Sequence, residues 1–498
     1  MSLAFDSTRT KLVYIFYNAS RKSSVAIDQL AIVISELLAE FVNDSSRFSS
    51  YLDLFQKIIF HVRSVGEHDI TYMMIYTLYT RFPDLAKSTL NECIEKYGCW
   101  RDIKYFCSYV HDQAGDDALI EYAIQLINRQ LYRDKLDLDS MSNCAKWIPR
   151  ENSAFAWLYE RLAVDWSSLV SPQLLKSGKN PDAMARAHNK CLAQYRKTLS
   201  FMNRVLDTTE IKLCAKQLDT IVPENINMAT FMKHNRTLLA LDYMNAERLP
   251  KPKSNRFIPF SMLVKEAIKA EPDMVNKPDK VNKPEKVNKP DMVNKQWKHW
   301  CKSYHNIPDM LPIIDMGSEI NYDVIGLACF IAEKSTLGRR IMLFSSSSAG
   351  WINLENVLDF SDMVRLVINT ISSAKIDTYG SGLDQIIQSF IEAKMIYSDI
   401  EKLSLAILTN NPWGSNHSFI QSRFFLKNIY IIPHMVYWNS YSDSLVALPC
   451  PVDFPRATFL SGVSRATLDH FCFMGLPAVR NFSPYETVSN LVLKHAAK

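Results

Sequence analysis

Glycine is scarce in this sequence, with only 13 glycines among 498 residues. No apolar run approaches the roughly 18 residues that a membrane-spanning helix requires. The first residues also lack the basic and then apolar segments of a secretory signal peptide. The low glycine content argues against a glycine-rich all-β protein and favours helices. The other two absences predict an intracellular, cytoplasmic protein that does not contact a membrane.

Sequence motifs of several enzyme classes are absent as well. We find no Gly-x-x-x-x-Gly-Lys-Ser/Thr, no Gly-x-Ser-x-Gly and no His-Glu-x-x-His. The polar stretch 345–350 follows a predicted strand, where it could hold an anion, but ordinary loop composition explains it equally well. His434 and His470 lie in apolar surroundings, which is typical of core histidines. We therefore expect a protein that is not an enzyme.

Cysteine pairs at metal-binding or redox spacing are also missing. The ten cysteines are scattered from Cys93 to Cys472 without a Cys-x-x-Cys pair. This pattern indicates free thiols in a reducing compartment. The net charge of +5 and pI of about 8.5 are mildly basic. Charge at this level indicates nucleic-acid binding only where it is clustered.

The N-terminal half has the periodicity of amphipathic helices. Residues 1–50 predict an N-terminal helical extension, and residues 51–270 predict an α-helical repeat domain of short helices with short connections. No fixed sequence period accompanies these helices, so the repeat prediction depends on their size and spacing.

The best-defined helix begins at Asn180-Pro181-Asp182, which supplies an N-cap, a first-turn proline and an acidic residue. Its apolar face comprises Leu192, Tyr195, Leu199, Met202 and Leu206. The opposite face and the following helix carry an uninterrupted basic stripe of Arg186, Lys190, Lys197, Arg204, Lys212 and Lys216. Such a stripe could contact nucleic-acid phosphates, or it could be a solvated outer face.

Residues 272–295 are four tandem hexapeptides of the type Pro-Asp-Met-Val-Asn-Lys. A proline every sixth residue opposes a continuous helix, and few large apolar side chains are present. We expect a disordered, extended linker over 271–296. It separates the helical part from a C-terminal domain over 297–498.

The C-terminal part alternates between strand-like and helix-like runs. The predicted strands are 311–315, 340–345, 403–409, 429–436 and 458–460, and the predicted helices are 320–335, 360–373, 383–396, 416–426 and 465–475. This alternation predicts a mostly parallel, doubly wound α/β sheet. The fold class is therefore α plus α/β.

One strand end stands out as a candidate site. The apolar run from Leu311 ends at Asp315, directly before a short turn and a helix. In open parallel sheets, ligands bind outside the carboxyl ends of the strands. Asp315 would therefore lie at such a site, unless it is an ordinary strand-end residue that caps the next helix.

This strand end resembles the start of a von Willebrand factor A domain, in which Asp-x-Ser-x-Ser helps to hold a divalent metal. Gly317 and Glu319 replace the two serines here, Leu383 stands at the threonine position of the second loop, and Asn410 replaces the third-loop aspartate. The resemblance implies a degenerate metal site of Asp315, Ser318, Glu319 and Asn410. A shifted alignment would bring in Ser381 or Asp384. We expect at most weak Mg²⁺ binding and no other cofactor.

Further stretches, 97–102, 145–149, 195–200 and 214–216, resemble an uncharacterised family that joins a TROVE-like helical domain to a von Willebrand A domain. The family occurs in eukaryotes, bacteria and large DNA viruses, and the hexapeptide expansion would suit a giant-virus member. Its architecture is similar to that of the Ro autoantigen, which closes a ring of helical repeats with a von Willebrand A domain and binds RNA.

These observations lead to one main expectation and two alternatives. We expect a macromolecular binding or scaffold protein, with RNA as the specific partner suggested by the Ro-like architecture. The first alternative is a structural or protein–protein interaction module of a virus, in the virion or the host cytoplasm. The second is a divalent-metal-dependent adhesion module. Protein partners are expected in either case, and the sequence does not indicate an oligomeric state.

Overall fold

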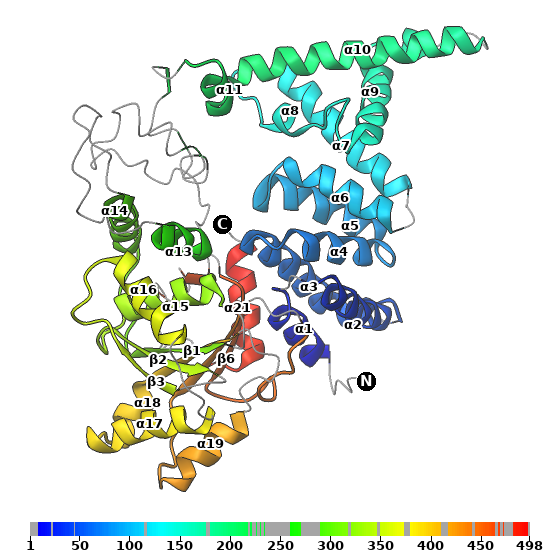
Figure 1. Ribbon diagram of the computed structural model, residues 1–498. Coiled ribbons are helices and arrows are strands. Elements are labelled where there is room, and N and C mark those ends of the chain that lie inside the picture. Colours follow the sequence, from blue (N-terminus) through cyan, green and yellow to red (C-terminus); the bar gives the residue numbers. More distant parts are fainter. Residues whose placement is uncertain are drawn as a thin grey trace, which may run out of the picture. The chain divides into compact units, whose positions relative to one another are not determined.

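A computed structural model describes residues 8–20, 23–43, 45–113, 117–175, 180–217, 259–269, 289–316, 320–345, 349–372, 379–409, 417–440, 444–463 and 482–496, with isolated positions between 220 and 234 and between 467 and 472. The chain divides into two compact units (Figure 1). The sheet unit comprises Met1–Glu67 and Pro223–Lys498, and the helical unit comprises His68–Val222.

A six-stranded sheet with the order β3-β2-β1-β4-β5-β6 lies in the sheet unit. Its strands are β1 (Met310–Met316), β2 (Arg340–Ser345), β3 (Ala349–Asn353), β4 (Ser404–Thr409), β5 (His434–Asn439) and β6 (Ala457–Ser461). All neighbouring strands are parallel except β2 and β3, which pair antiparallel at one edge. The strand order reverses between β1 and β4, and open α/β sheets bind their ligands at such a switch point.

Helices lie on both faces of the sheet (Figure 1). One face carries α15 (Tyr322–Lys334) and α16 (Phe360–Ser372), and the other carries α17 (Tyr379–Glu392), α18 (Tyr397–Lys402) and α19 (His417–Leu426). Every residue of β4 and β5 is buried, as expected for parallel strands covered on both faces. The prediction of a mostly parallel α/β sheet is confirmed.

The first three helices, α1 (Thr8–Tyr17), α2 (Ser24–Asn43) and α3 (Ser45–Val65), belong to the sheet unit. Helices α1 and α3 pack with α21 (Pro484–Ala496), α2 packs on α1 and α3, and both α1 and α21 contact β6. Six consecutive residues of α1, from Leu12 to Tyr17, are buried, and a helix that is apolar on all sides must lie inside a core. The expected extension over residues 1–50 is therefore part of this unit, and the helical unit begins at His68 instead of residue 51.

Helix α13 (Phe260–Lys269) also belongs to the sheet unit, although the expected helical domain extended to residue 270. It packs against α15, where Gly326 leaves room for the ring of Phe260. A Cβ atom at position 326 would lie 2.5 Å from the Cβ of Phe260. The close approach of these two helices therefore depends on the missing side chain.

Helix α14 (Lys289–Lys302) contains the last hexapeptide repeat. The prediction of an extended linker over 271–296 is therefore wrong for residues 289–296. Pro290 lies in the first turn, where a helix does not need its N–H. Trp297, two residues beyond the repeat, is buried and stacks on Phe360 with ring centroids 3.9 Å apart. Residues 271–288 lie outside the described part of the chain.

Two strands differ from their predicted limits. The expected strand 429–436 begins only at His434, because Pro433 lacks the N–H that a ladder needs. The stretch 345–350, expected as a loop, ends in the edge strand β3, whose first residues Ala349 and Gly350 give little strand signal. His434 is fully buried and its Nε2 lies 2.9 Å from Thr458 Oγ1, as expected for a core histidine. His470 lies outside the described residues.

The helical unit consists of successive helices that pack on one another. They are α4 (His68–Tyr79), α5 (Pro83–Glu92), α6 (Arg101–Asp112), α7 (Asp117–Leu136), α8 (Cys144–Trp147), α9 (Ala156–Val170), α10 (Pro181–Leu206) and α11 (Thr209–Cys214). A buried polar network joins three of them. Tyr195 of α10 donates to Asn128 Oδ1 of α7 at 3.1 Å, and Asn128 donates to Asp165 of α9 at 2.8 Å. These helices are therefore fixed to each other by hydrogen bonds as well as by apolar packing.

Candidate functional site

Helix α10 presents the basic stripe predicted from the sequence. The side chain of Asn180 accepts a hydrogen bond from the backbone N–H of Asp182 at 2.9 Å, so the predicted N-cap is present. Leu192, Tyr195 and Leu199 are buried against the rest of the helical unit. Because 100° separates successive residues of a helix, burial of this face turns the opposite face toward solvent.

Four basic residues of the stripe are exposed along α10, namely Arg186, Lys190, Lys197 and Arg204. No acidic residue in the described part of the chain forms an ion pair with Lys190, Lys197 or Arg204. The stripe runs from Arg186 to Arg204, which corresponds to about 27 Å at the rise of an α-helix. It is therefore a long row of positive charge that no acidic side chain of the described residues neutralises.

An aromatic side chain lies within this row. Phe201 is 48% exposed, and it follows Lys197 by four positions and precedes Arg204 by three, so all three share one face of α10. The spacing of Phe201 from Lys197 and Arg204 is visible in the sequence, but the predicted site comprised the basic residues alone. The row thus combines cations, which attract phosphates, with an exposed ring, on which an unpaired base can stack.

The two basic residues beyond α10 behave differently. Lys212 forms an ion pair with Asp207 at 3.1 Å and donates to the backbone oxygen of Thr220 at 3.2 Å. Lys216 is exposed and has a positive φ of 58° in the turn that ends α11. Lys212 is therefore partly neutralised, in contrast to Lys190, Lys197 and Arg204 of α10.

A second group of cations and rings surrounds Trp147 on α8. We call it the Trp147 cluster, and it comprises Arg101, Lys104, Tyr105, Lys146, Trp147 and Phe155. Three cations lie over the Trp147 ring: the Arg101 Cζ atom is 5.6 Å from its centroid, Lys104 Nζ is 5.7 Å away and Lys146 Nζ is 5.3 Å away. Such distances are within the range of cation–π attraction.

The charges of the Trp147 cluster are only partly balanced. Lys146 forms an ion pair with Glu210 at 2.9 Å. Arg101 and Lys104 form no ion pair with an acid in the described residues, and the Nε atom of Arg101 is buried without a hydrogen-bond partner there. Burial and the nearby charge of Arg101 lower the pKa of Lys104. The cluster therefore holds two close cations in a half-buried aromatic environment, an arrangement that an anion would stabilise.

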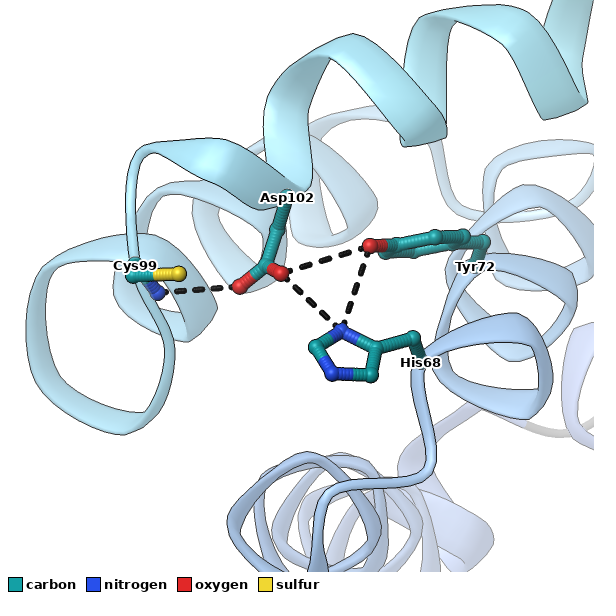
Figure 2. A network of polar contacts seen from close by, with 4 residues as sticks. All are labelled: His68, Tyr72, Cys99 and Asp102. Atoms are coloured by element: carbon teal, nitrogen blue, oxygen red, sulfur yellow. Dashed lines mark hydrogen bonds and ion pairs between the residues drawn. The ribbon is translucent and has the colours of Figure 1, made fainter. Parts of the chain in front are cut away.

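The stretch 97–102 also contains a buried carboxylate network, which Figure 2 shows. The Asp102 carboxylate accepts hydrogen bonds from the His68 ring at 3.0 Å, the Tyr72 hydroxyl at 3.3 Å and the Cys99 backbone N–H at 2.9 Å. The bond to Cys99 closes the turn that precedes α6, and the other two bonds attach this turn to α4. The network therefore positions the first turn of α6, from which Arg101 and Lys104 reach Trp147.

The predicted strand-end residue Asp315 is buried near the carboxyl end of β1, in register with Thr409 of β4. It therefore lies beside the switch point of the sheet. Ser318, Glu319 and Asn410, the other residues of the expected metal site, lie outside the described residues. Among the described residues, no group of three or more His, Cys, Asp or Glu side chains is arranged to hold a metal ion.

The residues expected from the second metal-binding loop lie in α17 instead. Leu383 is fully buried there, and Asp384 forms a bidentate ion pair with Arg423 of α19. Only the backbone of Ser381 is described. Asp384 thus links two helices on one face of the sheet, which leaves its carboxylate less available to a metal.

Residues of the N-terminal helices cover the carboxyl ends of β5 and β6. Asn439, the last residue of β5, donates from its side chain to the backbone oxygen of Tyr17 at 2.8 Å. Gly462, directly after β6, lies against Val65 and Ser20. The Oδ1 atom of Asn439 and the Oγ atoms of Ser440 and Ser461 are buried without a hydrogen-bond partner in the described residues. This edge of the sheet is therefore polar but closed over β5 and β6 by the chain itself.

The fold and these surfaces define a two-unit protein, with a helical unit that bears a basic face and an α/β unit with a mostly parallel sheet. No protein-family model matches the chain, and the comparison with curated proteins gives no match. No helix among the described residues is long and apolar enough to cross a membrane.

Proposed function

We propose that this protein is a non-enzymatic nucleic-acid-binding protein that contacts RNA through the exposed face of α10. The observation that carries the proposal is the row of Arg186, Lys190, Lys197 and Arg204, which is exposed and lacks acidic partners in the described residues. Phosphate contacts supply most of the affinity of non-specific nucleic-acid binding. The choice of RNA is supported by the resemblance of the sequence to TROVE-like proteins with a von Willebrand A domain.

The geometry supports a continuous contact with a nucleic-acid backbone. The four cations extend over about 27 Å along the helix axis. Lys190, Lys197 and Arg204 follow one another at intervals of about 10.5 Å, which exceeds the screening length of about 8 Å at physiological salt, whereas Arg186 and Lys190 are one turn apart and act together on a phosphate. Four phosphate contacts would give a slope of log K against log salt of roughly −3 to −4.

The proposal is tested with the purified full-length protein and a fluorescently labelled RNA hairpin, titrated between 50 and 200 mM salt. The double variant Lys197→Glu/Arg204→Glu reverses two exposed charges without touching the buried face of α10. We expect its affinity to fall by more than about tenfold and its salt slope to flatten by about 2, because two phosphate contacts are lost.

Helix α7 offers a matched control. Arg129→Glu/Arg133→Glu makes the same change in net charge on exposed residues of the same unit. If this control weakens binding as much as the α10 variant, the effect comes from net charge and the α10 face is not the contact surface. Absence of binding at 50 mM salt would overturn the RNA proposal altogether.

The second candidate function is that of a protein–protein interaction module, and exposed apolar residues of the sheet unit favour it. Leu426 and Tyr430 at the end of α19 are 73% and 66% exposed, and Ile396 before α18 is 63% exposed. Exposed apolar groups of this kind mark protein contact surfaces when they are contiguous. This candidate predicts that Leu426→Ser/Tyr430→Ser abolishes co-purification of a protein partner and leaves RNA binding unchanged.

A further inference from the structure

The Trp147 cluster differs from the α10 row in its chemistry. The α10 row is an exposed set of cations with one ring, whereas the Trp147 cluster places cations over the faces of several rings. Tyr105 is 43% exposed and packs edge-on against Phe155 at 5.5 Å. A solvent-accessible ring beside cations that have no ion-pair partner in the described part of the chain can contact a base and a phosphate at the same time.

We propose that the Trp147 cluster is a second contact site, which takes one unstacked nucleotide of a single-stranded nucleic acid. The phosphate lies between Arg101 and Lys104, and the base stacks on the exposed ring of Tyr105. This inference rests on the proposed nucleic-acid binding and narrows its ligand to single strands.

The aromatic rings restrict the expected class of ligand to single-stranded nucleic acids. Bases inside a duplex are stacked on each other, so a protein ring reaches a base face only where the strand is unpaired. Cations alone would bind a duplex as well as a single strand. The combination of Tyr105 with Arg101 and Lys104 therefore favours an unpaired strand over a helix.

Local structure holds the site in place before any ligand binds. The Asp102 network fixes the turn that begins α6, from which Arg101 and Lys104 project. The side chain of Asn203 on α10 donates a hydrogen bond to the backbone oxygen of Ala145 on α8 at 3.1 Å. Ala145 lies two residues before Trp147. Preorganisation of this kind reduces the entropy lost on binding.

The test measures anisotropy of a labelled single-stranded 12-mer of uridylate and of a 12-base-pair RNA duplex with the full-length protein, at four salt concentrations. The wild type should bind the single strand at least about fivefold more tightly than the duplex, because one stacked base contributes at least that factor. Single-residue variants then separate the roles of ring and cation.

Tyr105→Leu should weaken single-strand binding about fivefold or more and leave the salt slope unchanged, because it removes stacking but no charge. Lys104→Gln should flatten the slope by about 0.7, because it removes one phosphate contact. If either residue had only a structural role, its replacement would not change the single-strand affinity and the salt slope separately. Tyr105→Leu should leave duplex binding within twofold of the wild type, because a duplex offers no unpaired base to the ring.

The helical unit supplies two matched controls. Tyr132→Leu removes a tyrosine that is 45% exposed on α7, and Lys87→Gln removes a cation that lies 5.8 Å from the centroid of the Tyr122 ring. Both should bind the single strand like the wild type.

Three results would overturn the inference. Equal affinity for single strand and duplex would overturn the single-strand site and leave the proposed RNA binding by α10 intact. Unchanged binding by both Tyr105→Leu and Lys104→Gln would have the same meaning. Failure to bind either RNA at 50 mM salt would overturn the inference and the proposed function together.

Discussion

Asn18 and Val446 lie 428 positions apart in the chain and exchange two hydrogen bonds in the core of the sheet unit. The Asn18 side-chain amide donates to the Val446 oxygen at 3.0 Å, and the Val446 N–H donates to Asn18 Oδ1 at 2.8 Å. Both residues are fully buried. One side chain thus satisfies both backbone groups of a residue that belongs to no strand, and it attaches the end of α1 to the segment after β5.

Replacement of this side chain should destabilise the protein. Asn18→Ala leaves the buried N–H and C=O of Val446 without partners, and each unpaired buried group costs about 1–3 kcal/mol. We expect the free energy of unfolding, measured by urea denaturation, to fall by roughly 2–4 kcal/mol. Asn43→Ala, at the exposed end of α2, is the control and should change it by less than about 0.5 kcal/mol. Equal denaturation midpoints for both variants would show that residues 8–20 are not part of the core.

Gly462 should tolerate no larger residue. Its φ is +64°, and a Cβ atom there would lie 2.5 Å from the Cγ1 atom of Val65. Gly462→Ala therefore combines about 1 kcal/mol of backbone strain with about 1–3 kcal/mol of overpacking. Gly66→Ala separates the two effects, because Gly66 has a φ of +100° and open space around it. Thermal unfolding should show a clear loss for Gly462→Ala and a smaller one for Gly66→Ala, and the reverse order would contradict the close approach of Gly462 to Val65.

Acid should destabilise the sheet unit through His417. Burial lowers the pKa of His417 to about 4, and its Nδ1 atom lies 2.8 Å from the Tyr437 hydroxyl. The folded state thus binds the proton more weakly than the unfolded chain. The stability from a neutral His417 is complete above pH 6.5 and is lost as pH falls toward 4, by on the order of 2 kcal/mol after allowance for solvent screening. Urea denaturation of His417→Gln and wild type at pH 7.5, 6.0 and 4.5 should show a smaller acid loss for the variant, whereas parallel curves would argue against a neutral buried His417.

Magnesium should have little effect on stability. Asp315 is the one residue of the expected metal set that the structure describes, and Asp384 is paired with Arg423. A site with a Kd of 10 μM would stabilise the folded state by about 2.7 kcal/mol in 1 mM Mg²⁺. We expect thermal unfolding in 1 mM Mg²⁺ and in EDTA to agree within about 0.5 kcal/mol, and Asp315→Asn to leave that difference unchanged. A large stabilisation that Asp315→Asn removes would support the adhesion alternative instead.

Local sequence signals predicted the elements whose structure depends on near neighbours. The cap at Asn180 and the apolar spacing of Leu192, Tyr195 and Leu199 located α10 and its exposed basic face. The apolar runs before Asp315 and Thr409 located β1 and β4. Each of these features depends on residues that lie within about one or two helical turns, or one or two strand lengths, of each other. The local sequence therefore contains all of the information required to locate these elements.

Where a segment packs was less predictable from the same sequence. Proline spacing indicated a linker over 271–296, but Trp297 anchors the last repeat as a helix against Phe360. The expected helical domain included α3 and α13, which belong to the sheet unit. Helical periodicity shows that a helix has an apolar face, but it does not show which partner covers that face.

Periodicity and capping act over short distances, so they were enough to predict the helical and α/β character of the two parts and the basic face of α10. The packing of the folded chain places α1 over the edge of the sheet, through Asn18 and Asn439. It also brought Arg101 and Lys104 to Trp147, more than forty positions further along the chain. Contacts of this kind depend on how helices pack, because no local pattern specifies which distant side chain fills a given space.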